Sequence, residues 1–182
     1  MTVGAGATVE LFSNPLSVTG TLTVAGKVET AGTTAVTMGS GVDRLILDPG
    51  LSFVGTVKGG GANSTLELAA GTGTGVLNAL GTEFTNFGKV TVDAGATWTV
   101  DAVASALSGV TITGSGGSNT LTLTTAGTVN LAGVTGFPTI RLASTGANTL
   151  TLANTNFTGV TGSPPRSPSM TVTMATRSRP QP

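Results

Sequence analysis

Short apolar segments alternate with turn-forming residues along most of the chain. In residues 15–28, apolar side chains recur at every second position, for example at Leu22 and Val24. A two-residue period is typical of a β-strand that buries one face. Between residues 41 and 101, similar segments of strand length recur, separated by Gly, Asn, Asp and Ser, and none has a helical period. The pattern therefore predicts an all-β protein.

Three segments resemble one another, and their spacing indicates a repeat. They are GGANSTLEL at residues 60–68, GGSNTLTL at 116–123 and TGANTLTL at 145–152. Leu66, Leu121 and Leu150 hold the same place in them, and their separations of 55 and 29 residues correspond to two periods and one period of about 28 residues. Self-similarity with a period of about 20–50 residues is the signature of a solenoid or an array.

The strand-like repeats favour a parallel β-helix over other solenoids. Helical repeats need a period of about 3.6 residues, and a propeller blade needs about 40 residues or more. We expect a β-solenoid with coils of roughly 20–30 residues, built from short strands with Gly and Asn corners and stacked at about 4.8 Å. Neighbouring coils then bury one another's apolar side chains. The inward-facing aliphatic ladders are predicted to contain Leu66, Leu68, Leu121, Leu123, Leu150 and Leu152.

Polar and aromatic residues fit the same architecture. Asn119 and Asn148 directly precede predicted strands, and Ser64 holds this place in the first copy, where Asn63 is displaced by one residue. Asn tolerates a left-handed backbone, and its amide can stack on copies in neighbouring coils, so we expect a corner ladder rather than a ligand site. The single Trp is expected to fill or cap the core together with four Phe residues. These aromatic residues are Trp98, Phe84, Phe87, Phe137 and Phe157.

The last segment of the chain differs in composition from the rest. Residues 163–182 hold five of the eight Pro and three of the five Arg, which predicts a disordered tail after a β-solenoid repeat region at residues 1–162. Read one base earlier, the codons for residues 170–176 would encode Asp and Gly at some positions and permit Asn at others. Because those residues suit a repetitive β-protein better, we hypothesise that the tail is a frameshift product.

The composition excludes most of the common kinds of catalytic site. Charged residues make up 9% of the chain, and Cys, His and Tyr are absent. The chain therefore lacks disulfides, thiol chemistry, and the commonest general base and metal ligand. No apolar run approaches the ~18 residues of a membrane-spanning helix, and the first residues lack the features of a signal peptide. Because there is no basic stripe with interleaved aromatic residues, nucleic acid is not an expected partner.

Two kinds of candidate site compete with structural roles. Asp48 and Asp93, brought near each other by stacking, could form the carboxylate pair of a polysaccharide-cleaving enzyme. Further candidates are Asp43, Arg44 and Asp101. However, Asp before Pro or Gly is typical turn chemistry, and we expect turns at Asp48 and Asp93.

The strings GSGGSNTLT and GGGANSTLE resemble calcium-binding nonapeptides but lack the Asp that supplies charge and oxygen ligands. The sequence therefore predicts no enzyme, no catalytic residue, no cofactor and no metal site.

One stretch resembles a known kind of protein. Residues 44–98 contain the phrases RLILDPGLSFVGTVKGG, STLELA and EFTNFGKVTVDAGATW. These phrases are similar to the repetitive passenger regions of Gram-negative autotransporter and haemagglutinin-like surface proteins, and the likeness covers roughly residues 1–162. The resemblance implies a β-helical passenger, export and a surface or adhesive role, and it implies no catalytic residue. Without a signal peptide or a translocating barrel, the chain is expected to be a fragment of a larger reading frame.

Together these features predict a non-enzymatic structural segment of a secreted or surface-exposed adhesin passenger, located at the extracellular or outer-membrane surface. The alternatives are a polysaccharide-active β-helix hydrolase or lyase, and a calcium-binding secreted repeat protein. Expected partners are glycans or proteins on a host or cell surface, without direct membrane insertion of this segment. Because end coils expose unpaired strand edges, we also expect self-association through uncapped ends.

Overall fold

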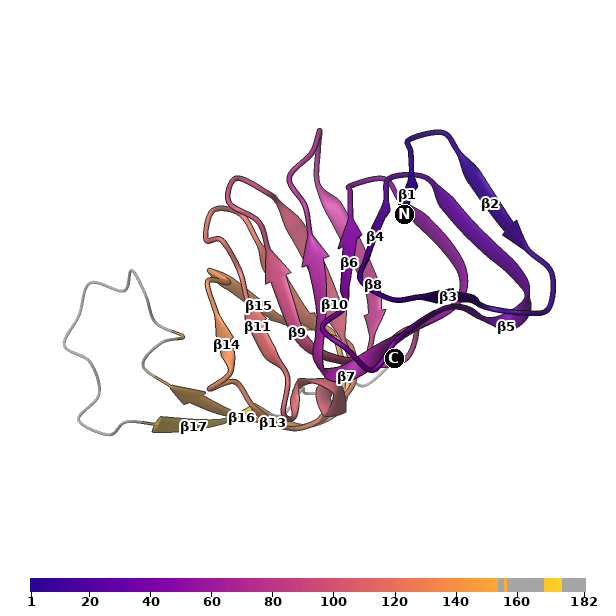
Figure 1. Cartoon of the computed structure of the whole chain (residues 1–182). Coiled ribbons are helices and arrows are strands. Elements are labelled where there is room, and N and C mark those ends of the chain that lie inside the picture. The colour runs from indigo at the N-terminus through magenta and orange to yellow at the C-terminus, as the bar shows by residue number, and fades with distance from the viewer. Residues whose placement is uncertain (154–155, 157–168, 175–182) are drawn as a thin grey trace, which may run out of the picture.

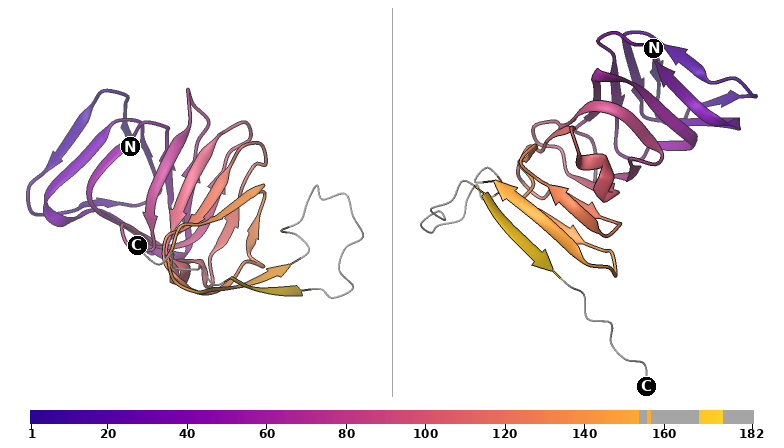
Figure 2. Two further views of the ribbon diagram at one scale, coloured as in Figure 1. Left: turned by 180° about the vertical axis from the view of Figure 1, so that it is seen from behind. Right: turned by 90° about the horizontal axis from the view of Figure 1, so that it is seen from below.

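The alternation of apolar and polar residues folds into short strands whose apolar side chains share one interior. The computed structural model describes residues 1–153, 156 and 169–174. It is an all-β solenoid of about 7 turns, with stacked coils of about 21 residues. Figure 1 shows the coils following one another along the stack from β1 to β16, and Figure 2 shows the same stack from behind and from below. The prediction of a parallel β-helix is thus confirmed.

Each coil contributes one segment to each of three faces, which we call A, B and C. Face A contains β1 (Thr2–Val3), β4 (Thr21–Val24), β6 (Arg44–Leu47), the ends of β7 (Ser52–Leu68) and β9 (Phe84–Val92), β11 (Thr111–Thr113) and β14 (Val134–Thr135). Face B contains β2 (Thr8–Leu11), the starts of β5 (Lys27–Met38) and β7, then β8 (Gly75–Leu80), β10 (Trp98–Ala102), β12 (Thr120–Leu123) and β15 (Thr139–Leu142).

Face C contains the remaining segment of each coil. Its members are β3 (Leu16–Val18), the end of β5, the middle of β7, the start of β9, the short 3₁₀ helix η1 (Ala104–Leu107), β13 (Gly127–Asn130) and β16 (Asn148–Ala153). The long strands β5, β7 and β9 turn corners between faces, so their hydrogen bonds join most strands into one 14-stranded sheet. All strand pairs up to β16 are parallel.

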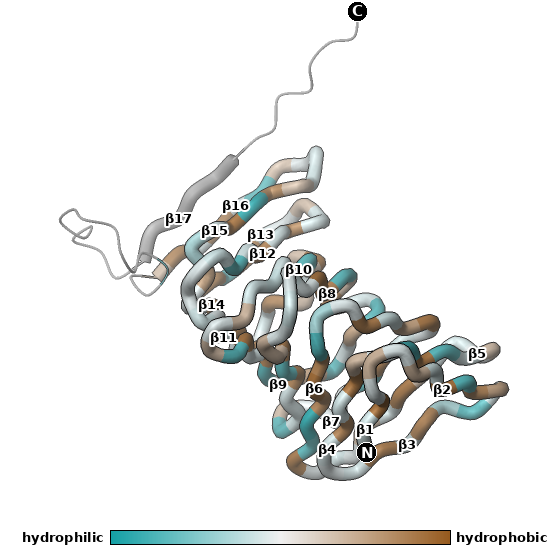
Figure 3. The backbone as a smooth tube through the Cα atoms, turned by 90° about the horizontal axis from the view of Figure 1, so that it is seen from above, coloured by the Kyte–Doolittle hydropathy of each residue, from teal (hydrophilic) through white to brown (hydrophobic). Residues whose placement is uncertain are grey.

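Aliphatic ladders run through the interior of the stack. On face A, Leu45 pairs with Leu22 on one side and Leu66 on the other, and the ladder continues through Val90 to Ile112. None of these five side chains is exposed to solvent. Figure 3 shows the resulting alternation of hydrophobic and hydrophilic positions along the strands. Since each ladder side chain packs against the coils above and below it, the coils depend on their neighbours for a core.

The predicted 28-residue period is wrong. Leu66, Leu121 and Leu150 do not stack on one another, because they lie on faces A, B and C respectively. Their ladder neighbours are Leu45 and Val90 for Leu66, Val100 and Ile140 for Leu121, and Val129 for Leu150. The spacing of 29 residues is therefore one coil plus one face. The sequence pattern that repeats consists of the residues of a corner and of the strand that follows it. This pattern occurs at different corners of the coil.

The inward orientation of these leucines is nevertheless confirmed for most of them. The buried ones are Leu66, Leu68, Leu121, Leu123 and Leu150. Leu152, near the end of the stack, is half-buried and packs against the edge of the core. The ladders thus contain the predicted residues but combine them differently.

The C-terminal end of the stack has an antiparallel neighbour. Within the predicted tail at 163–182, the described residues form β17 (Ser169–Met174), which pairs antiparallel with β16. The other residues of that tail lie outside the described residues. The frameshift hypothesis rests on codons, which a protein structure does not test. Among the described residues, no helix has the length and hydrophobicity needed to cross a membrane.

Candidate functional site

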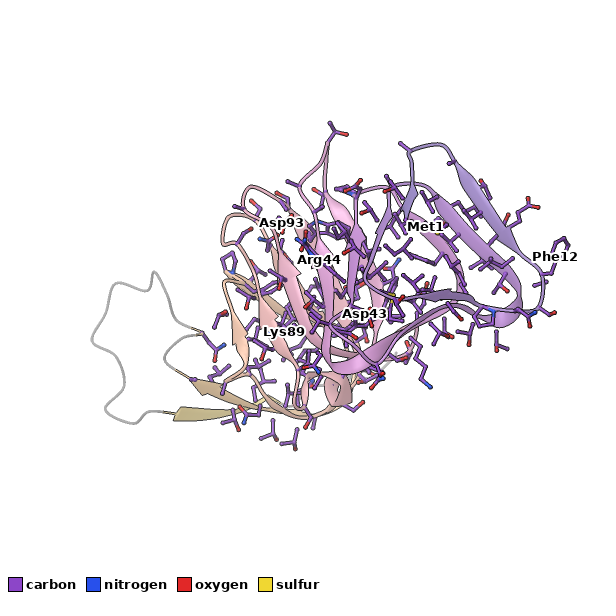
Figure 4. All side chains as sticks on the ribbon, in the orientation of Figure 1. Met1, Phe12, Asp43, Arg44, Lys89 and Asp93 are labelled. Carbon is purple, nitrogen blue, oxygen red and sulfur yellow. The ribbon has the colours of Figure 1, made fainter. Side chains whose placement is uncertain are left out.

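The outward surface of face A carries a row of side chains in register. Thr21, Arg44, Thr65 and Lys89 follow one another from coil to coil. Successive members are separated by the strand spacing of about 4.8 Å. A second row, two residues further along each strand, contains Glu67. The stacking therefore brings two cations and one acid from three coils onto one face. Figure 4 labels Arg44 and Lys89.

Arg44 and Glu67 form the strongest polar contact of this patch. The Arg44 Nε atom donates a hydrogen bond of 2.6 Å to Oε2 of Glu67, and a terminal guanidinium nitrogen bonds to the same oxygen. The Glu67 side chain is 10% exposed, whereas that of Arg44 is 51% exposed. A carboxylate this deeply buried needs a partner, because removing a charge from water is costly. Arg44 therefore serves first to neutralise Glu67.

Asp93 extends the cluster at the corner that follows face A. Burial, the negative charge of Glu67 and a hydrogen bond between the two side chains raise the pKa of Asp93, whereas the charge of Arg44 acts in the opposite direction. We call Arg44, Glu67, Lys89 and Asp93 the face A cluster. It combines two interacting acids with Arg44, and Lys89 lies on the same face one coil beyond Glu67.

The chemistry available to this cluster is limited by its geometry. Glycosidases hold their two carboxyl groups about 5–9.5 Å apart, which leaves room for the sugar and the water. Glu67 acts directly on Asp93 and raises its pKa, so the two carboxyl groups are neighbours rather than a separated pair. The Arg44 contact also holds Glu67 in place. The arrangement is suited to holding adjacent coils together or to contacting an acidic group through its cations.

Sequence reasoning missed Glu67, although a signal was present. Glu67 ends the string GGGANSTLE, and the corresponding positions in the two similar segments are Thr122 and Thr151. An acid at a position that otherwise carries Thr marks a departure from the repeat. Arg44, by contrast, was a sequence candidate, and the structure places it in the cluster.

Asp48 and Asp93 occupy the same corner position in different coils. The amide groups of Asp48, Ala69 and Asp93 each donate to the preceding coil, at Val24, Leu47 and Leu68. Ala69 therefore lies between the two acids, which are about 10 Å apart along the stack at the usual strand spacing. The backbone carbonyl oxygen of Asp48 accepts a hydrogen bond from the amide of Leu51 at 3.3 Å, and that of Asp93 accepts one from the amide of Ala96 at 3.1 Å. The predicted turns are confirmed.

Asp43 and Asp101 lie away from the cluster. Asp43 is buried at the corner before face A, where its Oδ1 accepts a hydrogen bond from the amide of Gly20. Its Oδ2 has no hydrogen-bond partner in the part of the chain that the structure describes. Asp101 lies on face B, in register with Thr122 and then Arg141 in the following coils. The structure therefore assigns Asp43 to the corner and leaves Asp101 separate.

Asn119 and Asn148 form corners as predicted, but the expected amide ladder between them does not occur. The Nδ2 of Asn119 donates to Ser115 Oγ at 3.1 Å, and the Nδ2 of Asn148 donates to Ser144 Oγ at 2.8 Å. The two residues precede strands on different faces, so they never stack on each other. Each side-chain amide instead donates hydrogen bonds within its own corner. Ser64 also bonds within its own corner, accepting a hydrogen bond from the amide of Gly60 at 2.7 Å.

The aromatic residues behave as predicted. Trp98 is fully buried, and its Nε1 donates a hydrogen bond of 2.9 Å to the carbonyl oxygen of Ala69. Its backbone amide donates to Oδ1 of Asn119 at 2.8 Å. The buried Phe residues are Phe84, Phe87 and Phe137. Phe157 lies outside the described residues.

The two glycine-rich strings form corners of the solenoid. GSGGSNTLT contains Asn119 and its corner, and GGGANSTLE contains the Ser64 corner and ends at Glu67. Within residues 1–153 and the other described positions, no group of three or more His, Cys, Asp or Glu residues could hold a metal ion. The acids of the face A cluster thus form a pair rather than a cation cage.

Comparison of the whole chain with known protein families, with curated proteins and with solved structures found no match.

Proposed function

We propose that this chain is a non-enzymatic β-solenoid segment of a secreted or surface-exposed adhesin passenger of the autotransporter type. The observation that carries the proposal is the continuous stack of about 7 parallel coils with its ladder core. The resemblance of residues 44–98 to such passengers supports it. The sparse charge of the chain, 9% of residues, leaves outer faces rich in Thr rather than in catalytic groups.

A stack of this kind suits mechanical display. Hydrogen bonds between coils run along the stack, so stretching the rod loads many of them together. The corners project outward and carry exposed side chains, such as those of Phe12 and Val42. A rod with exposed corners presents contact groups at a distance from the surface that anchors it. Its expected partners are glycans or proteins on a host or cell surface.

Protease treatment of intact cells tests the surface location. Cells that produce the native reading frame are treated with a non-penetrating protease and then probed with antibodies against this chain. The proposal expects the antibody signal to disappear from intact cells while a cytoplasmic control protein survives. A signal that is lost only after lysis would refute the surface location.

One observation favours a second candidate, a polysaccharide-active hydrolase or lyase. The acids Glu67 and Asp93 lie beside the Arg44 guanidinium on an outward face. The close approach of the two carboxyl groups argues against it. An activity assay distinguishes this candidate from the non-enzymatic proposal. The chain is incubated with neutral and acidic polysaccharides, and new reducing ends and unsaturated ends are measured. Activity that is abolished in both Glu67→Gln and Asp93→Asn would establish the enzyme and overturn the non-enzymatic proposal.

Self-association is a further part of the proposal. The first coil, formed by β1, β2 and β3, has strand partners on one side among the described residues. Unpaired strand edges are templates for pairing with another chain. Residues 1–20 carry a single charged side chain, Glu10, so this edge has little of the charge that normally discourages such pairing.

A further inference from the structure

The short helix η1 interrupts face C and leaves a groove in the solenoid surface. In the neighbouring coils this face is built from extended segments, whereas a 3₁₀ turn covers less distance per residue. A hollow of about 340 Å³ lies between η1 and the start of β9. A second hollow of about 290 Å³ lies between the end of η1 and the coil of β13. Both are lined by Ser108 and Val110, so they adjoin. We call the pair the η1 groove.

The walls of the η1 groove combine an apolar floor with a polar rim. Leu80, Phe84 and Phe87 line it and are almost completely buried, so the apolar surface within reach of a ligand belongs to the half-buried Ala106 and Val110. Hydroxyl and amide side chains surround this apolar surface. They belong to Thr85, Asn86, Ser105, Ser108, Thr111 and Asn130. No residue that lines either hollow carries a charge.

Two amide side chains of the rim are fixed by backbone contacts. Asn86 donates through Nδ2 to the carbonyl oxygen of Gly59 at 2.7 Å, which leaves its Oδ1 as an acceptor. Asn130 accepts through Oδ1 from the amide of Ala132 at 2.9 Å, which leaves its Nδ2 as a donor. Pre-oriented donors and acceptors reduce the ordering cost of binding. The rim of the groove therefore offers both a hydrogen-bond donor and a hydrogen-bond acceptor, and neither carries a charge.

Backbone strain is concentrated at the same place. Among the described residues, the two non-glycine residues with positive φ are Ala79 at 59° and Asn86 at 58°. Asn86 lines the groove, and Ala79 begins the turn that leads into it through hydrogen bonds to Thr82 and Glu83. Non-glycine residues in this conformation are uncommon and cluster at ligand-binding sites. The strain is thus a second observation that points to the groove.

We propose that the η1 groove binds a neutral oligosaccharide. A sugar has an apolar ring face for the floor and many hydroxyl groups for the uncharged rim. An acidic or basic ligand would find no counter-charge, and a purely apolar ligand would leave the amide groups unpaired. The hollows lie near the lower end of the ~300–1,000 Å³ range of ligand sites, which suits one or two sugar rings in each. This inference rests on the proposed display function, for which it supplies a ligand class.

Saturation-transfer NMR on the full chain tests the groove. The probes are four neutral disaccharides (lactose, maltose, cellobiose and N,N′-diacetylchitobiose) and one acidic comparator, digalacturonic acid. We expect transfer to at least one neutral sugar and none to the acid. Ser108→Trp, which fills the shared part of both hollows, should weaken that binding at least tenfold. Ser118→Trp is the matched control, because Ser118 is also exposed but lies outside the groove.

Each outcome of this experiment has a defined meaning. Circular dichroism verifies that both variants keep the β-sheet spectrum, and Asn86→Gly replaces Ser108→Trp if the latter does not fold. Absence of transfer to every neutral sugar at millimolar concentration overturns the proposal, as does binding that Ser108→Trp or its replacement leaves unchanged. Binding of the acid alone overturns it too. The protease treatment of intact cells is independent of these results, so failure of the groove and failure of the display function are distinguishable.

Discussion

Gly75 lies directly against the ring of Trp98, since a Cβ atom added at Gly75 would come within 2.5 Å of three ring atoms. The two residues are paired in adjacent coils, β8 and β10. Gly75→Ala should therefore destabilise the chain by about 1–3 kcal/mol, the usual cost of overpacking a core. Urea unfolding followed by the fluorescence of the single Trp measures this change. Gly41→Ala is the control, because nothing lies within 4 Å of its added Cβ.

Arg44→Ala should destabilise the chain because it leaves the buried Glu67 carboxylate without its partner. We expect a cost of about 1–3 kcal/mol, between the values for exposed and fully buried pairs. Lys27→Ala is the matched control, because its acid partner Glu29 is 28% exposed, against 10% for Glu67, and the pair should contribute less than about 1 kcal/mol. Equal losses of stability in the two variants, measured by urea unfolding, would contradict the burial argument.

Asp93→Asn should change how stability depends on pH. The folded chain holds the Asp93 proton more tightly than the unfolded chain does, because the pKa of Asp93 is raised above its ordinary value of 3.8. Wild-type stability should therefore fall as the pH rises from 3.8 through the raised pKa. Asp93→Asn removes this penalty, so it should raise the melting temperature at pH 7 and not at pH 3. A melting temperature that is lowered by the substitution at pH 7 would show that the carboxylate is stabilising.

Asn119→Ala should be more costly than Asn148→Ala. Both residues are buried, but Asn119 uses its Oδ1 to accept the Trp98 amide, whereas Oδ1 of Asn148 has no partner among the described residues. Removing Asn119 leaves that buried amide unpaired, at a cost of about 1–3 kcal/mol. Thermal unfolding of the two variants provides the comparison, and a larger loss for Asn148→Ala would contradict the ranking.

Residues 1–182 produced in isolation should form dimers or larger assemblies through the first coil. Thr8→Lys places a charge on the outward face of β2 at the open edge and should shift the population toward monomers in light scattering. Val54→Lys, on β7 within the stack and already 47% exposed, is the control and should leave the association unchanged. A wild-type chain that remains monomeric at high concentration would refute self-association.

Much of the architecture could be predicted because the alternation of apolar and polar residues depends on local sequence. That alternation gave the strands, the inward leucines and the buried Trp98. The period could not be predicted in the same way. Ser115 and Asn119 recur as Ser144 and Asn148, and this pattern specifies a corner without specifying which of the three corners it forms.

The candidate site was less accessible from the sequence than the fold. Glu67 and Arg44 are separated by 23 residues, and their contact follows from the register between β6 and β7 rather than from any local pattern. The η1 groove depends on a single 3₁₀ turn at Ala104–Leu107, which follows a segment that reads as a strand. Contacts between coils require the coil length, and the incorrect period of 28 residues prevented their prediction.

The repeated corner motif advances by one face each time it recurs in the order Leu66, Leu121, Leu150. It therefore follows a screw path around the axis of the stack. A chemical group fixed at one position of this motif would point in a different direction at each recurrence. Duplication of the motif would consequently distribute such a group around the rod, and a straight row of identical groups along one side would require a duplication of whole coils instead.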